Sequence, residues 1–154
     1  MHERREMETL NNLCTWLDRE RVFLFDRQLP FSNETAHALT VRFRQPEAWG
    51  IFLDTERLPT LAEKKTALLH ECGHYATGAT HELSSRFDLI EKHEYKANKW
   101  AVRRAVSEEE LDQAIADGCT EIWQLAERFE ISEDLMKQVI CWYTYGNVST
   151  ELYF

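Results

Sequence analysis

Two histidines four residues apart, His70 and His74, stand around a glutamate in the stretch HECGH, and these residue types can hold and use a metal ion. On an α-helix, residues four apart lie on one face with their Cβ atoms about 5 to 6 Å apart. Both imidazoles can therefore bind one ion at about 2.0 Å from each nitrogen. Glu71 is turned about 100° from His70 around the helix. This turn places its carboxylate beside the ion, where it can accept a proton from a bound water.

The segment around HECGH is predicted to be the capped helix that such a site requires. Thr60 and Glu63 have the spacing of a capping box after Pro59, and Gly78 is typical of a helix end. One side of this helix is an apolar stripe, and the other carries the histidines beside small residues that leave room for an ion and a substrate. The stripe consists of Leu61, Leu68, Cys72, Tyr75 and Ala76, and the other side of Ala67, His70, Glu71, His74 and Gly78. The alternative interpretation is a pair of half-exposed histidines on an ordinary amphipathic helix.

A second predicted helix offers the third protein ligand that a catalytic zinc ion normally has. In SSRFDLIEKHEYKANKWAV, apolar residues recur at helical spacing, and Glu94 falls among them. A carboxylate on a core-facing stripe is costly unless it is paired or bound to a metal ion. We therefore expect Glu94 to be the third ligand, with a salt bridge to a lysine or arginine as the alternative.

Three other side chains are alternatives to Glu94. Glu91 lies one turn earlier but off the stripe. His93 would give an all-histidine site, but it lies about 100° from Glu94 around the helix. His81 follows the first helix in a predicted loop, where we expect a surface histidine or a group that contacts the substrate.

The stretches HECGHYATG and EYKANKWAV together resemble the ImmA/IrrE family of metallopeptidases. The family pattern is HExxH, often with a glycine a few residues on, and then E-x-x-A-N-x-aromatic-A in a second helix. The resemblance implies that His70, His74 and Glu94 bind one zinc ion per chain and that Glu71 is the catalytic base. Lys96 departs from the family, because many members carry a second acid there, and this leaves Glu94 as the only acid in the pattern.

The resemblance covers about residues 20 to 145 and also implies an activity. Family members of this size commonly belong to phages or mobile elements and act on a repressor. The implied function is therefore a zinc-dependent endopeptidase that cleaves a specific protein, such as a helix-turn-helix repressor. A non-catalytic metal-binding regulatory or protein-interaction module of the same fold is the alternative. Glu71 favours the enzyme, since a scaffold held by zinc needs no base there.

The donor that stabilises the oxyanion in peptide hydrolysis is not identifiable from the sequence. Tyr75, His81, His93 and Tyr95 are candidates for this role or for substrate contacts. Cys72 lies between the metal ligands in sequence, but we expect it on the core side of the helix.

The elements that must position these residues predict an α+β fold. Short apolar or alternating stretches at 21–25, 38–43 and 49–54 indicate a small sheet of about three strands, of which the last two are adjacent. A helix over residues 4–20 precedes the sheet, and the two motif helices follow it.

Cap residues predict three more helices after the motif helices. Ser107, Thr120 and Ser132 each precede a helical stretch. The last two helices resemble a helix-turn-helix, but the second would turn the carboxylates of Glu133 and Asp134 toward DNA phosphates. DNA binding is therefore disfavoured.

The net charge of −9 arises entirely in the C-terminal third of the chain. Residues 107–154 hold 11 acidic and 2 basic side chains, whereas residues 1–106 hold 16 of each kind. We expect a zinc metallopeptidase domain at 1–106 and an acidic helical extension at 107–154, packed together as one unit. The acidic surface argues against nucleic acid and membranes as direct partners and suits a basic protein.

The bulk sequence favours a cytoplasmic protein. No apolar run approaches the roughly 20 residues that cross a bilayer, and the charged start MHERREMETL does not look like a secretory signal. In the cytosol the four cysteines stay free thiols. Their spacings are long and include no CxxC pair, so a zinc site built from cysteines is not expected.

Overall fold

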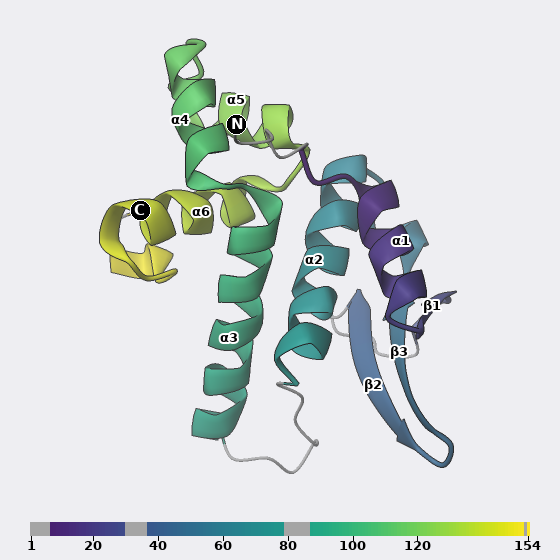
Figure 1. Ribbon diagram of the computed structural model, residues 1–154. Coiled ribbons are helices and arrows are strands. Elements are labelled where there is room, and N and C mark those ends of the chain that lie inside the picture. Colours follow the sequence, from purple (N-terminus) through teal and green to yellow (C-terminus); the bar gives the residue numbers. More distant parts are fainter. Residues whose placement is uncertain (1–6, 30–36, 79–86, 153) are drawn as a thin grey trace, which may run out of the picture.

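The computed structural model describes residues 7–29, 37–78, 87–152 and 154, which form a three-stranded sheet and six α-helices. The sheet lies at one side, α1 and α2 pack on it, and α3 lies on the far side of α2 (Figure 1). The helices α4, α5 and α6 gather at the end of α3. This architecture confirms the predicted α+β fold with a small sheet.

The sheet consists of β1 (Val22–Asp26), β2 (Ala38–Arg44) and β3 (Glu47–Leu53). β3 lies in the centre, parallel to β1 and antiparallel to β2. The predicted pairing of the last two strands is therefore confirmed, and β2 is an edge strand of this sheet.

The pairing of β2 with β3 sets the direction of Thr40. Ile51 of β3 is fully buried, and Thr40 is its partner in the register. Directly paired residues on neighbouring strands share a face of the sheet. Thr40 therefore lies on the face that packs against α2.

The first helix, α1 (Leu10–Arg19), begins later than predicted. Thr9 is its N-cap, and the Thr9 side chain accepts a hydrogen bond of 3.1 Å from the backbone N–H of Asn12. The predicted start at residue 4 is wrong, because residues 7–9 are not helical and the threonine fixes the helix start.

The HECGH motif lies on α2 (Leu61–Thr77), as predicted. The Thr60 hydroxyl accepts from the Glu63 N–H at 3.1 Å, and the Glu63 carboxylate accepts from the Thr60 N–H at 3.0 Å, which confirms the capping box. Gly78 ends the helix at φ 63°, a conformation that glycine adopts without a Cβ clash.

The expected apolar stripe of α2 is confirmed only in its middle. Leu68 and Cys72 are fully buried. Leu61 and Ala76, at the two ends of the helix, are exposed, so their assignment to the core is wrong. The buried part is the turn that carries the motif.

The second motif helix, α3 (Phe87–Ala105), packs along α2 and touches it closely at one position. A Cβ atom built on Gly73 would lie 2.4 Å from the carbonyl oxygen of Ala97, so only glycine fits there without moving a helix. Glu94 lies one turn before Ala97 on the same face. The contact therefore brings Glu94 close to α2. The predicted cap at Ser85 lies outside the described residues.

Three C-terminal helices follow: α4 (Glu108–Ala116), α5 (Ile122–Phe129) and α6 (Glu133–Tyr145). Their predicted N-caps Ser107 and Ser132 are confirmed, since each side chain accepts a hydrogen bond from the backbone N–H three residues on.

The predicted N-cap of α5 is wrong. Glu121, not Thr120, is the N-cap residue. The amide oxygen of Gln124 accepts hydrogen bonds of 3.1 Å from the backbone N–H groups of both residues. The side chain of this glutamine thus bonds back to the residues before the helix and sets the helix start one residue later than predicted. The likeness of α5 and α6 to a helix-turn-helix stays a prediction.

One buried apolar cluster joins the sheet, the motif helices and the C-terminal helices. Ile51, Leu68, Val102 and Met136 belong to it and are each fully buried.

The expected boundary between a peptidase domain and an extension at residue 106 stays a prediction. Within the described ranges, no helix combines the length and apolar character that crossing a membrane requires.

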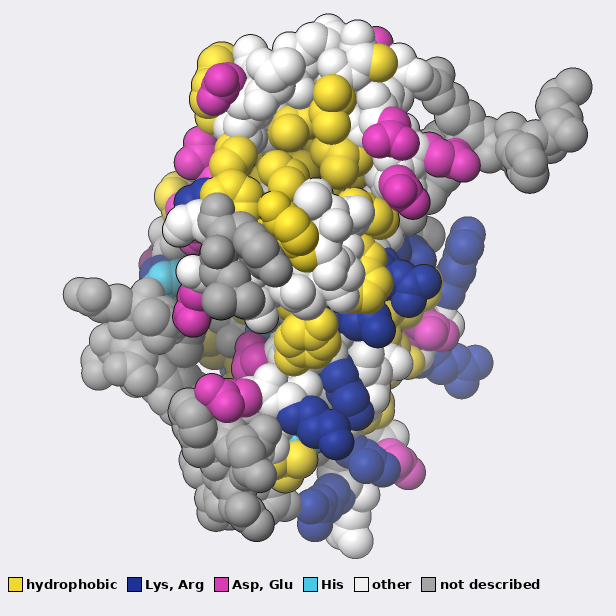
Figure 2. Space-filling model, turned by 90° about the vertical axis from the view of Figure 1, so that its left-hand side faces the viewer, with side chains coloured by type: hydrophobic (Ala, Val, Ile, Leu, Met, Phe, Trp, Pro, Cys, Tyr) yellow, Lys and Arg dark blue, Asp and Glu magenta, His cyan; other side chains and the backbone are white. Residues whose placement is uncertain are grey.

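The outer side of α3 is basic. Lys92, Lys96, Lys99 and Arg103 recur every three or four residues and so share one side of the helix. Figure 2 looks onto this side of the molecule, where Lys and Arg side chains form a column below an apolar area. These cations lie on the side of α3 that faces away from Glu94 and α2.

We predict that Gly73→Ala separates α2 from α3. The added methyl would overlap the Ala97 carbonyl, and such overpacking costs about 1 to 3 kcal/mol. Urea unfolding should show this loss in the free energy of unfolding. The matched control is Ala76→Ser, which changes an exposed position on the same helix. Its free energy of unfolding should stay within about 0.5 kcal/mol of that of the unchanged protein. An unchanged stability of the Gly73 variant would contradict the close packing.

Candidate metal centre

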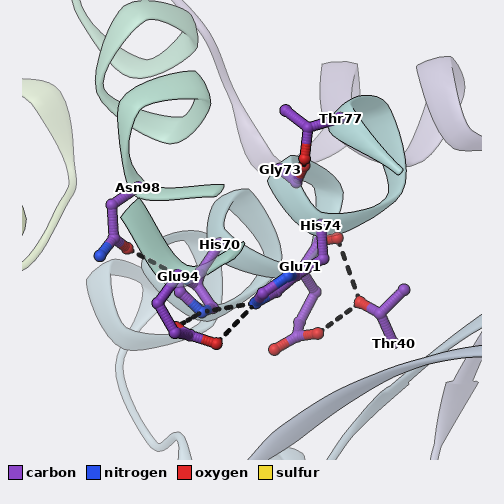
Figure 3. Close-up of polar contacts among 8 residues, drawn as sticks. All are labelled: Thr40, His70, Glu71, Gly73, His74, Thr77, Glu94 and Asn98. Carbon is purple, nitrogen blue, oxygen red and sulfur yellow. Dashed lines mark hydrogen bonds and ion pairs between the residues drawn. The ribbon is translucent and has the colours of Figure 1, made fainter. Parts of the chain in front are cut away.

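Three predicted ligands converge from two helices. His70 Nε2 lies 2.9 Å from Glu94 Oε2, and His74 Nε2 lies 3.0 Å from Glu94 Oε1. The two Nε2 atoms are 3.1 Å apart. Figure 3 shows the two imidazoles on α2 and the carboxylate on α3 pointing toward one another. Among the described residues this is the group of histidine, cysteine and acidic side chains that could hold an ion.

The donor set fits a zinc ion. Zinc binds imidazole nitrogen and carboxylate oxygen at about 2.0 to 2.2 Å, so neighbouring ligands of a tetrahedral ion are about 3.3 Å apart. The observed separations of 2.9, 3.0 and 3.1 Å are slightly shorter, as expected where hydrogen bonds join the same atoms. Two imidazoles and one carboxylate leave a further position of a tetrahedral ion open, which is the arrangement of catalytic sites. Manganese and iron also accept this donor set.

The contacts within the cluster set the charges of its members. Burial acts to lower the pKa of His70, but the hydrogen bond to Glu94 and the charges of Glu71 and Glu94 outweigh burial and raise this pKa. Burial acts to raise the pKa of Glu94, but its hydrogen bonds with His70 and His74 hold this pKa well below the usual range. The ionised Glu94 thus favours a proton on the imidazole of His70. A divalent cation would take the place of that proton, because metal ligands bind deprotonated.

Asn98 orients the first histidine. Its side-chain oxygen lies 2.8 Å from His70 Nδ1, so an N–H at Nδ1 can donate to it. This hydrogen bond keeps Nε2 directed at the cluster, where a metal ion could displace its proton, which is how such a partner prepares a histidine for a metal ion. Asn98 lies one turn after Glu94, so the same helix supplies a ligand and a group that holds another ligand.

Glu71 lies outside the three-residue cluster and is held from the sheet. The hydroxyl of Thr40 on β2 donates a hydrogen bond to Glu71 Oε2 and lies 3.1 Å from the Glu71 carbonyl oxygen (Figure 3). Glu71 is buried, with 7% of its surface exposed. A buried carboxylate held by this hydrogen bond beside the candidate ligands can accept a proton from a water there and deliver it elsewhere.

The cluster lies in a groove of about 770 Å3. β2 forms one wall, α2 forms the floor, and α3 and the beginning of α6 form the other side. The groove is lined, outside the cluster and its supports, by His37, Ala38, Leu39, Arg57, Leu58, Glu63, Thr66, Ala67, Ala101, Ser132, Asp134, Leu135 and Gln138. A groove bounded by a strand edge and a helix end has room for an extended polypeptide.

The remaining predicted site residues do not join the cluster. Glu91 and Tyr95 are exposed on α3, and neither they nor His93 line the groove. The ring of Tyr75 packs against Trp16 of α1 and Trp49 of β3, on the other side of α2. His81 lies outside the described residues.

Cys72 lies on the core side of α2, as expected. Its side chain is fully buried, and this burial raises the pKa of its thiol. A buried protonated thiol is unreactive, which supports a packing role. All four cysteines are free thiols.

Three groove residues were not singled out from the sequence. The role of Asn98 could have been inferred, since it lies four residues after Glu94 and therefore on the same helix face. Thr40 and His37 have no comparable signal, because they reach the groove only through the pairing of β2 in the sheet.

The sequence comparisons agree with this geometry. The family model Peptidase_M78, described as the IrrE N-terminal-like domain, matches residues 24–140. That range contains β2, both motif helices and most of α6. No curated protein and no solved structure matches the chain significantly.

We predict that Asn98→Leu weakens zinc binding. Loss of the oxygen that holds His70 should lower zinc affinity about 10- to 100-fold, the usual effect of removing such a partner. Competition with a chromogenic chelator measures this affinity. Asn98→Asp is the matched control, since it keeps an acceptor oxygen and should retain most of the affinity. Equal zinc affinities of the leucine variant and the unchanged protein would exclude the orienting role.

Proposed function

The chain belongs to the peptidase family of the IrrE N-terminal-like domain, and on this premise we propose that it is a zinc-dependent endopeptidase. The convergence of two imidazoles and one carboxylate, whose ligand atoms lie within 4.8 Å of one another, carries the proposal. We assign His70, His74 and Glu94 as the zinc ligands and Glu71 as the catalytic base. When bound there, zinc would act as a Lewis acid toward a peptide carbonyl and toward water.

Glu71 moves the proton in this proposal. Its carboxylate oxygen accepts a proton from the attacking water and then gives it to the nitrogen of the leaving amine, as a general base and general acid. Thr40 keeps this carboxylate beside the ligands by its hydrogen bond. We therefore treat Thr40 as a positioning residue.

The walls of the groove support a polypeptide substrate. β2 is an edge strand and lines the groove, and extended peptides commonly add to such an edge by backbone hydrogen bonds. Every second carbonyl of a peptide paired with β2 would point away from this strand into the groove that holds Glu71 and the ligands.

The lining of the groove limits which residues can be the oxyanion donor of this reaction. Tyr75, His93 and Tyr95 do not line the groove. Among the groove side chains with N–H groups, His37 and Arg57 can also carry a positive charge, and we add both to the candidates.

We propose a basic protein as the substrate, in the first instance a helix-turn-helix repressor in the cytoplasm. The support is the acidic C-terminal third, whose residues Glu130, Glu133 and Asp134 surround the turn between α5 and α6. Asp134 also lines the groove, so this acidic surface is continuous with the site.

Replacement of Glu71 by glutamine separates the enzyme from a non-catalytic metal-binding module. We expect Glu71→Gln to keep its zinc but to lose cleavage by about 10²- to 10⁴-fold, the share that general acid–base catalysis supplies. Elemental analysis measures the zinc, and mass spectrometry of co-expressed candidate substrates measures the fragments. Unchanged cleavage would remove Glu71 from the mechanism. Absence of stoichiometric metal in the purified protein would count against the enzyme itself.

Replacement of Thr40 tests its positioning role. Thr40→Val keeps the shape but removes the hydroxyl, and we expect kcat to fall about tenfold because the carboxylate of Glu71 is no longer held. The KM and the zinc affinity should not change, since Thr40 contacts neither the substrate side chains nor the ligands in this proposal. Thr40→Ser restores a hydroxyl and should restore kcat. A parallel loss of zinc in the valine variant would indicate a general structural defect.

Neutralising the acidic surface tests the docking of a basic protein. We expect Glu130→Gln with Glu133→Gln to slow cleavage of a basic protein substrate severalfold and to reduce the dependence of the rate on salt, because rim charges mainly steer association. Adding Asp134→Asn should slow it further. Cleavage that is insensitive to all three changes would exclude docking through this surface.

A further inference from the structure

The beginning of α6 is fixed against the helix that carries the metal ligands. Lys65 of α2 is fully buried, and its ammonium donates a hydrogen bond of 2.6 Å to the carbonyl oxygen of Phe129, the last residue of α5. The backbone N–H of Ser132 donates to the Thr66 hydroxyl at 2.9 Å. Thr66 lies one turn before His70, so these bonds hold the first turn of α6 at a set position in the groove.

Two side chains of α6 face this groove with unused hydrogen-bond acceptors. Asp134 and Gln138 are four residues apart and line the groove together. No hydrogen bond or ion pair joins Asp134 to any described residue. The Oε1 atom of Gln138 is buried and has no hydrogen-bond partner within the described ranges. Since an unsatisfied buried acceptor costs free energy, a donor from a ligand would stabilise this arrangement.

The other charged groups on the groove walls are already engaged. Arg57 lies 3.4 Å from the buried carboxylate of Asp54. The Glu63 carboxylate accepts hydrogen bonds from Thr60 in the capping box. Outside the metal cluster and its supports, Asp134 is thus the groove carboxylate that remains available in the described part of the chain.

A partner for this pair must carry a positive charge and several donors. A guanidinium has five N–H donors in a planar fork and can serve a carboxylate and an amide oxygen together, whereas an ammonium is a point charge with three donors. The acid itself has a local reason to be present, because a carboxylate in the first turn of a helix is favourable. That reason does not apply to Gln138 in the second turn. The pair together therefore indicates a ligand.

We propose that Asp134 and Gln138 form a subsite that binds an arginine side chain of the substrate close to the scissile bond, with lysine as a weaker ligand. The subsite rests on the proposed peptidase function, since it lies in the same groove. The subsite would select peptides that carry arginine at one position. The acidic surface around the subsite attracts basic proteins in general.

The test compares degenerate heptapeptide mixtures with a central arginine or a central citrulline, which has the same shape without the charge. Zinc-loaded protein should release amines at least about tenfold faster from the arginine mixture, the gain expected from hydrogen bonds to a charged group. Asp134→Asn and Gln138→Leu should each reduce this ratio. The matched control is Glu127→Gln, an exposed acid on α5 outside the groove, which should not change the ratio.

Binding to the zinc-loaded Glu71→Gln variant separates the subsite from turnover. Calorimetric titration should give a Kd that is about tenfold lower for the arginine mixture than for the citrulline mixture. Equal rates and equal Kd values for the two mixtures, or no binding of either, would overturn the subsite. Cleavage of both mixtures without preference would overturn the subsite and leave the peptidase standing. Preferential binding without any cleavage by the unchanged protein would retain the subsite and count against the peptidase.

Discussion

At Gly73 the backbones of α2 and α3 touch, and the candidate metal centre depends on this contact. The carbonyl oxygen of Ala97 occupies the space that any Cβ at position 73 would need. With the helices this close, a glutamate side chain from α3 reaches two imidazoles on α2 at hydrogen-bond distance. A wider separation would leave a histidine pair without a third donor, and two imidazoles alone do not make the usual three-ligand catalytic site.

The sheet supplies what the two helices lack. Thr40 belongs to β2, but its partner in the register is the buried Ile51 of β3, and this pairing directs the hydroxyl to Glu71. The ligands are thus held by helix packing, whereas the proposed base is held by strand pairing. Because different elements hold the ligands and the base, the carboxylate of Glu71 stays beside the ligands without joining them.

The C-terminal helices belong to the site as well as to the fold. A fully buried lysine on α2 binds the end of α5, and the first turn of α6 then forms a wall of the groove. Burial of a lysine is costly unless its ammonium is hydrogen-bonded, and the last carbonyl groups of a helix favour a cation. The acidic character of the C-terminal third therefore reaches the groove at Asp134, close to the proposed chemistry. The basic side of α3 faces away from the groove, so its cations do not neutralise the acidic side chains at the site.

Local sequence patterns were sufficient for most of the elements and for the part of the candidate site that lies on α2. The capping box of Thr60 and Glu63, the cap at Ser132 and the stop at Gly78 act within one helical turn, so their spacing along the chain predicts them directly. The error at Thr120 has the same local scale, because the side chain of Gln124 bonds back to the backbone N–H groups of Thr120 and Glu121 and the helix cap lies at Glu121. His70, Glu71 and His74 share a helix, and their relative placement follows from its period.

The sequence by itself thus determined the two motif helices, the caps of α2, three strands and the residue types that can bind zinc. Only the tertiary structure decided that Glu94, rather than Glu91 or His93, reaches the histidines, and that Thr40 and the first turn of α6 enclose them. Tyr75 illustrates the same limit, since it lies next to a ligand in sequence but packs between two tryptophans on the other side of α2. The physical reason is the distance along the chain over which each interaction acts. Hydrogen bonds along a helix join residues about four apart. The choice among side chains on separate elements depends instead on packing, which the order of residues along one element does not encode.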